Sequence, residues 1–205
     1  MKRLLVLSVL MLAAVAPANA QDGVGELTPI IGFRAGGTLN DAVTGESFSI
    51  QPSWSWGVVA GISVGSPNLI IEATYLQQLT RASSDTTFGG GLGGLHDMRI
   101  QTALAGVQWD FSPKARVRPL VSAAVGATSI EAQGGGKATS FTASLSGGVK
   151  VMASRNFGAR LELRTLALFS GASLKGLCQF SECNVGLTGW GTLQVDVSIG
   201  TLFSF

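Results

Sequence analysis

The residue types that most often perform catalysis meet in one short stretch of the sequence. The only histidine, His96, precedes Asp97 and follows Ser83, Ser84 and Asp85. A histidine held between a hydroxyl and a carboxylate is the arrangement that activates a serine nucleophile. The spacing here matches no recognised nucleophile motif, so we expect an ordinary loop histidine. No catalytic residue is predicted, and hydrolase or acyltransferase activity is a minor alternative.

A glycine-rich stretch and a cysteine pair are the other candidate sites. FGGGLGGL (88–95) has the composition of a phosphate-binding loop, but such a loop needs a helix opening on its last glycine, and no helical pattern follows. Cys178 and Cys183 are close in sequence, and two thiols alone do not make a metal site. In an exported chain this pair predicts a disulfide. No cofactor and no metal are expected.

The remaining charged residues follow the pattern of a strand. In ARLELRTLALF (159–169), Arg160, Glu162 and Arg164 alternate with apolar residues. A period of two places the two sets on opposite faces of a β-strand. In a soluble sandwich the apolar face is buried, whereas in a membrane barrel it faces lipid and the charges are enclosed. Export, composition and the order of the strands decide between these two environments.

The first twenty residues indicate export. Lys2 and Arg3 precede an apolar run, and Ala18-Asn19-Ala20 forms an A-x-A cleavage pattern. These features are typical of a signal peptide, so we expect cleavage after Ala20. The expected organisation is a signal peptide (1–20), a short periplasmic N-terminal segment (21–28) and one β-barrel (29–205).

The composition favours a barrel in a membrane. Charged residues make up 13% of the sequence, about half of the roughly 25% that is usual in soluble domains. Mean hydropathy is +0.38, yet no stretch after the leader is as long and apolar as a membrane helix. A closed β-barrel is then the remaining way to span a bilayer. The net charge of +2 comes from Lys2 and Arg3, so no nucleic-acid partner is expected.

Eight segments with period-two alternation follow the leader, and no convincing helical periodicity does. They span about 29–39, 53–65, 69–79, 97–111, 118–131, 138–152, 158–169 and 187–204. The links after the second, fourth and sixth segments are short, whereas the others are mostly longer and rich in glycine or polar residues. Outer-membrane barrels have short periplasmic turns and long extracellular loops. We predict an all-β, eight-stranded antiparallel up-and-down transmembrane barrel with both termini in the periplasm.

Small polar residues and a few charges fall on the inner face of this barrel. Small side chains suit the narrow interior of eight strands, and an Arg or Lys facing lipid at the midplane costs about 2–4 kcal/mol. Four cations and four anions are therefore predicted to point inward and pair, because unpaired buried charge is costly. They are Arg34, Glu72, Asp110, Lys150, Arg160, Glu162, Arg164 and Asp196. We expect them to plug the lumen, and an ion-conducting pore is the alternative.

In the fourth segment (97–111) the apolar residues do not all fall on one face of the expected strand. Trp109 and Phe111 share one face, whereas Ile100 and Leu104 fall on the other. A β-bulge near Gly106 would return all these apolar residues to the outer face.

Aromatic residues fall near strand ends, as expected of two interfacial belts. The belt beside the long loops is predicted to contain Trp54, Trp56, Phe141, Phe169 and Trp190. The belt beside the short turns is predicted to contain Phe33, Trp109, Phe111, Phe157, Phe203 and Phe205.

The C-terminus and one hairpin resemble a known family. The chain ends SIGTLFSF, with Phe203 and Phe205, and this is similar to the last strand of bacterial outer-membrane barrels. In those proteins the final aromatic residue is recognised by the barrel assembly machinery. FTASLSGGVKVMASRNFGARLELRTL (141–166) resembles a hairpin of the outer-membrane β-barrel domain family, the small OmpA/OmpX-like eight-stranded barrels. The resemblance implies eight strands, insertion in the outer membrane and no catalytic site.

A non-enzymatic structural or surface-interaction role is the function we expect. Passage of a small solute is the alternative, and a lipid A-modifying barrel enzyme using His96 is a minor one. A soluble lipocalin-like barrel is disfavoured by the final Phe205 and by the lack of a Gly-x-Trp start. Expected partners are outer-membrane lipid, the barrel assembly machinery and an extracellular or envelope protein at the long loops. Phe48, Phe88 and Phe180 are the candidate contacts there.

Overall fold

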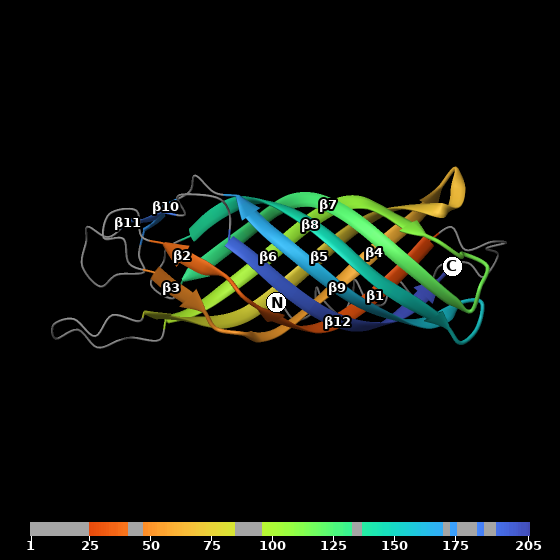
Figure 1. Ribbon diagram of the computed structural model, residues 1–205, viewed down its shortest axis with the longest axis horizontal. Helices are drawn as coiled ribbons and strands as arrows, with labels where there is room; N and C mark the ends of the chain where they lie inside the picture. The colour runs from red at the N-terminus through yellow and green to blue at the C-terminus, as the bar shows by residue number, and fades with distance from the viewer. Residues whose placement is uncertain are drawn as a thin grey trace, which may run out of the picture.

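The protein is a closed antiparallel β-barrel (Figure 1). The computed structural model describes residues 25–40, 47–84, 96–132, 137–169, 173–175, 184–186 and 192–205. Each barrel strand pairs with the next along the chain, and the last pairs with the first. The barrel strands are β1 (Gly25–Ala35), β4 (Ser53–Val64), β5 (Ser66–Ser84), β6 (His96–Asp110), β7 (Val117–Ala132), β8 (Lys137–Met152), β9 (Phe157–Phe169) and β12 (Thr192–Ser204). The predicted fold class is confirmed.

Four short strands extend one end of the barrel and were not predicted. They are β2 (Thr38–Asn40), β3 (Ser47–Ile50), β10 (Ser173–Lys175) and β11 (Asn184–Gly186). β3 pairs with the end of β5, and β10 with β11. Figure 1 shows all four gathered at one end, which we call the loop end. In the described part of the chain, no helix is long and apolar enough to cross a membrane.

The opposite end, which we call the turn end, carries the short connections. Only Gly65 separates β4 from β5, and its φ of 68° lies in the left-handed region that favours glycine. Residues 111–116 and 153–156 form the other two turns. Gly25 and Phe205 exchange backbone hydrogen bonds at this end. β1 thus begins at Gly25, four residues before the expected start, and it includes Glu26.

The register of the barrel fixes the tilt of its strands. Hydrogen-bonded neighbours can be followed once around the barrel from Gly25 through Ile71, Ala123 and Thr165, and they return to β1 at Ala35. The stagger is therefore ten residues, and barrels of this kind tilt their strands by roughly 35–45°. With eight strands, side chains can fill the interior.

The outer face of the barrel is apolar and the inner face is largely polar. On β9, Leu163 is 54% exposed, whereas Arg160 and Glu162 are each 2% exposed. The same alternation runs along β1 and β12. A soluble barrel that buries its apolar face is therefore excluded, because these leucines, valines and isoleucines point outward. In a bilayer this exterior contacts lipid.

β6 contradicts the predicted bulge. Its register against β5 and β7 is continuous, and Gly106 pairs with Glu72 and Ala124 without a shift. Ile100 and Leu104 are 0% and 5% exposed, so they are lumen residues. The prediction failed because it assumed that every apolar side chain must face lipid, whereas this lumen also contains apolar positions.

The ring contacts correct one member of the aromatic belts. Phe33 lies opposite Trp54 in the register, with ring centroids 5.8 Å apart, so it belongs to the loop-end belt. Phe157 and Phe203 pack at the turn end with centroids 5.6 Å apart. The prediction misplaced Phe33 because it set the start of β1 too late. Trp190 lies outside the described residues.

One lumen-facing glycine allows two strands to approach closely. A Cβ on Gly126 would collide with the backbone oxygen of Ala103 on β6. We expect Gly126→Ala to destabilise the barrel by about 1–3 kcal/mol, the usual cost of forcing extra volume into a packed site. Gly147→Ala is the matched control, because its nearest neighbour, the Leu120 oxygen, is 4.0 Å away. Urea unfolding in vesicles would measure both, and equal stabilities would contradict the prediction.

Candidate functional site in the barrel lumen

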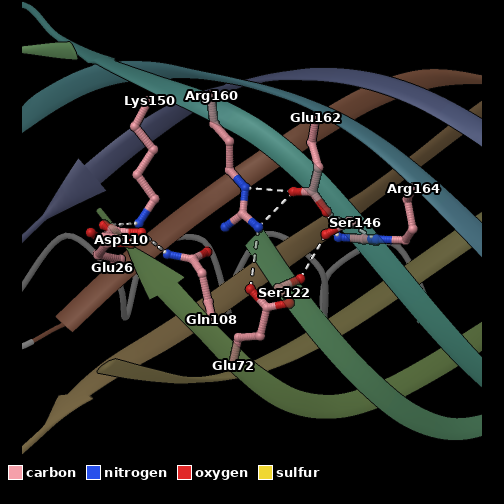
Figure 2. Close-up of polar contacts among 10 residues, drawn as sticks. All are labelled: Glu26, Glu72, Gln108, Asp110, Ser122, Ser146, Lys150, Arg160, Glu162 and Arg164. Carbon is pink, nitrogen blue, oxygen red and sulfur yellow. Dashed lines mark hydrogen bonds and ion pairs between the residues drawn. The ribbon is translucent and has the colours of Figure 1, made fainter. Parts of the chain in front are cut away.

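Nine charged side chains are buried among the described residues. Eight of them are the predicted lumen residues, and the ninth is Glu26, which was predicted to lie in a periplasmic segment (21–28). Five are acids and four are bases, so the described lumen carries a formal charge of −1. They form three groups along the barrel, and two of these groups appear in Figure 2.

The first group lies near the turn end and centres on Lys150. Its Nζ donates to Glu26 Oε2 at 2.6 Å and to Asp110 Oδ2 at 3.0 Å. Gln108 Nε2 donates to the other oxygen of Asp110 at 2.6 Å. Lys150 extends from β8, Glu26 from β1 and Asp110 from β6, so the group joins strands that are not neighbours in the sheet. These contacts cross the interior.

The second group lies in the middle of the lumen and centres on Glu162. Arg160 Nε donates to Glu162 Oε2 at 2.6 Å, and Arg164 donates to Oε1 through Nε and Nη2. Arg160 Nη2 also donates to Glu72 Oε2 at 3.2 Å. β5 and β9 lie four strands apart in the ring of eight, so the contact between Arg160 and Glu72 spans the lumen (Figure 2).

The third group lies toward the loop end. Arg34 Nε donates to Asp196 Oδ2 at 3.2 Å, and Ser55 Oγ donates to the same oxygen at 2.7 Å. Arg34 Nη1 and Nη2 and Asp196 Oδ1 have no hydrogen-bond partner among the described residues. This group is therefore less fully hydrogen-bonded than the one around Glu162.

Hydroxyl pairs occupy other inward positions of β6, β7 and β8. Ser122 and Ser146 lie 2.7 Å apart, and Thr128 contacts both Thr102 and Thr142 at 3.0 and 2.7 Å. Short side chains of this kind bridge neighbouring strands without occupying the space that the arginines need. These hydroxyl pairs connect neighbouring strands in the wall of the lumen and do not cross its centre.

Buried apolar side chains also lie in the lumen near the loop end. These side chains are fully or almost fully buried, and several lie near the ends of strands that lead into the long loops. They are Ile50, Met98, Ile100, Ile130, Leu166 and Leu168. Other buried apolar side chains of the lumen lie near the turn end, among them Ile70, Leu120, Met152 and Leu202. The lumen therefore contains apolar side chains as well as charges, which the alternation of the sequence did not indicate.

The remaining predicted sites are resolved only in part. Asp97 Oδ1 accepts a hydrogen bond from Arg81 Nε at 3.1 Å on the exposed surface. The backbone of His96 pairs with Ala82 at the loop end of β6. The glycine-rich stretch, Cys178, Cys183, Phe88, Phe180, Ala18 and Ala20 lie outside the described residues, so the disulfide and the cleavage site stay predictions.

The C-terminal residues form the seam of the barrel. Phe205 bonds through its backbone to Gly25. Phe203 stands opposite Leu27 on β1 and Phe157 on β9. The predicted assembly signal therefore lies on the strand that closes the barrel, and its recognition by the assembly machinery stays a prediction.

Comparison with solved structures finds small membrane barrels. Neisserial surface protein A has a TM-score of 0.60 at 13% identity, over 88% of this chain and 97% of that one. OprG from Pseudomonas aeruginosa has a TM-score of 0.60 at 12% identity, over 89% and 97%. AlkL, solved in lipid bilayers, has a TM-score of 0.56 at 14% identity, over 93% and 94%. No protein-family model and no curated protein matches the sequence.

At these identities the likeness concerns the fold, and the exterior of the barrel agrees with it. The apolar outer face, the aromatic residues near both ends and the enclosed charges are the features that a bilayer requires of a barrel. The chain is thus an eight-stranded transmembrane β-barrel of the small outer-membrane type.

Proposed function

We propose that this protein is a non-enzymatic integral barrel of the bacterial outer membrane whose lumen is closed by its charged groups. The turn end faces the periplasm and the loop end faces outward, as is usual for such barrels. The observation that carries the proposal is the contact between Arg160 and Glu72, which joins opposite walls through buried side chains.

The geometry of two of the three groups supports closure. Lys150 bridges Glu26 and Asp110 near the turn end, and Glu162 holds Arg160 and Arg164 in the middle. A hydrated ion would have to separate these pairs, and each separation leaves a buried charge unpaired, which is costly. The barrel then contributes a rigid support, and its function resides in the surface that the long loops present to envelope or external proteins.

Liposome swelling tests closure to small solutes. We expect liposomes that contain the protein to swell in an isotonic pentose solution no faster than protein-free liposomes. A general porin reconstituted at equal mass is the positive control. Swelling at a rate comparable to that of the porin would contradict the proposal.

Passage of a small apolar solute is the second candidate. A cavity of about 760 Å³ lies at the loop ends of β4 to β7, and its wall includes Thr80, Met98 and Glu131. The apolar part of its wall includes Leu79 and Met98, and the charged part includes Arg81, Asp97 and Arg99. Faster uptake of a fluorescent alkane derivative into protein-containing vesicles would favour this role, and the pentose result would be unaffected.

A further inference from the structure

Basic side chains gather at the turn end without partners. Lys114 and Arg116 lie in the turn between β6 and β7, and Arg155 lies in the turn between β8 and β9. All three are exposed, and no ion pair or side-chain hydrogen bond involves them within the described residues. Arg118 lies beside them and donates from Nε to the Ala115 oxygen at 3.0 Å. We call Lys114, Arg116 and Arg155 the basic turn patch.

The two turns form one surface. Met152 N donates to the Arg116 oxygen at 2.8 Å, which places the start of the second turn beside the end of the first. Hydrogen bonds from Ala115 to Ser112 and from Ala153 to Phe157 close the two turns. Backbone contacts therefore hold the two turns that carry these residues side by side.

The acids of the described turn end do not neutralise this patch. Glu26 and Asp110 are buried and already bind Lys150.

The loop end is different, because its described basic side chains lie among acids. Arg81 pairs with Asp97, and Lys137 with Glu131. Arg99 stands opposite Glu131 in the register of β6 and β7. An excess of unpaired positive charge is thus a property of the basic turn patch among the described surfaces.

The patch lies immediately beside lipid-facing residues. Arg116 precedes Val117, Lys114 follows Phe111 by three residues, and Arg155 precedes Phe157 by two. Phe111, Val117 and Phe157 are exposed on the outer face of the barrel. With about 3.3–3.6 Å per residue, the backbones of the three basic residues lie within roughly 11 Å of exposed apolar residues. Their long side chains can therefore reach the headgroup region, which lies just outside the hydrocarbon core.

We propose that the basic turn patch binds the phosphate headgroups of anionic phospholipids in the membrane leaflet at the turn end. Clusters of Lys and Arg beside a membrane-spanning segment attract anionic lipid. The patch is exposed and lies beside exposed rings, which suits several headgroups better than one enclosed soluble anion. The proposal rests on membrane insertion but not on closure of the lumen.

Quenching of Trp109 by brominated lipid tests the proposal. Trp109 lies on the lipid face of β6, close to the patch, and Trp54→Phe, Trp56→Phe and Trp190→Phe leave it as the single tryptophan. The full-length mature chain is folded into vesicles that contain brominated phosphatidylglycerol or brominated phosphatidylcholine. We expect roughly a tenfold preference for phosphatidylglycerol at low ionic strength. The preference should approach unity at about 1 M salt, where the Debye length is about 3 Å.

Two triple variants separate the patch from general charge effects. Lys114→Gln/Arg116→Gln/Arg155→Gln should abolish the preference at Trp109. Arg81→Gln/Arg99→Gln/Lys137→Gln removes the same number and types of charge at the loop end and should retain it. Heat-modifiable gel mobility checks that both variants are folded. A preference that survives the first triple variant, or that both variants lose equally, would overturn the proposal.

Competition by inorganic phosphate distinguishes binding of lipid headgroups from binding of a soluble phosphate. If the site binds lipid headgroups, millimolar phosphate should change the quenching no more than chloride at equal ionic strength. Displacement of brominated phosphatidylglycerol by phosphate alone would assign the patch to a soluble anion instead. No preference in the wild type would also overturn the proposal, and an acidic protein would then be the partner to seek. Liposome swelling measured on the same vesicles tests closure of the lumen independently of lipid binding by the basic turn patch.

Discussion

Replacing Glu162 by alanine is expected to destabilise the barrel by about 3–5 kcal/mol, the cost of breaking a buried ion pair by removing one partner. Glu162 accepts hydrogen bonds from both Arg160 and Arg164, so its loss leaves two guanidinium groups without their main carboxylate. Glu72 would remain as the only acid in contact with Arg160 among the described residues. Reversible urea unfolding in lipid vesicles, followed by tryptophan fluorescence, measures the change.

The control for this prediction is an ion pair outside the lumen. Glu131 pairs with Lys137 on the exposed surface, and Glu131→Ala should change stability by less than about 1 kcal/mol. If Glu162→Ala proves as mild as Glu131→Ala, the central group contributes little to the fold. Replacing Glu72, Arg160, Glu162 and Arg164 together by apolar residues of similar volume should recover stability, because no charge of the central group is then left unpaired.

Placing an arginine on the outer face of β9 is the second large effect. Leu163 is exposed near the middle of its strand, so Leu163→Arg puts a charge in the bilayer interior. We expect a loss of about 2–4 kcal/mol in the free energy of folding into vesicles. The physical cause is the transfer of the guanidinium from water into hydrocarbon. Unfolding titrations in vesicles of one lipid composition measure the loss.

Depth provides the control for the second prediction. Leu193 is also exposed, but it is the second residue of β12, at the loop end. Leu193→Arg should therefore cost only about 0–1 kcal/mol, as expected near an interface. Equal losses at the two positions would mean that Leu163 does not face the membrane interior.

The sequence predicts the barrel well because its main signals are local. Alternation of charge and leucine in β9 assigns its two faces, and the parity of the connection lengths orders the strands. The cost of charge in lipid then directs Arg160, Glu162 and Arg164 inward, where the structure has them. These predictions can be made without information on which strands pair in the sheet.

The misses concern contacts between distant residues. Glu26 was predicted in a short segment before the first strand, whereas in the structure β1 begins at Gly25 and includes Glu26. Only the position of Lys150, 124 residues away, shows that Glu26 belongs to the lumen. Ile100 and Leu104 were misread for a related reason. Apolar side chains that point into the lumen produce the same local sequence pattern as a β-bulge that shifts the alternation of inward and outward residues.

Planar-bilayer recording tests the central claim, that the charged groups close the lumen, most directly. The wild-type protein is predicted to give no stable single-channel conductance. A variant with alanine at Glu72, Arg160, Glu162 and Arg164 and also at Glu26, Asp110 and Lys150, checked for folding by heat-modifiable mobility, should open discrete channels, because the side chains of neither group then meet across the lumen. Stable single-channel conductance from the purified wild type would contradict the account.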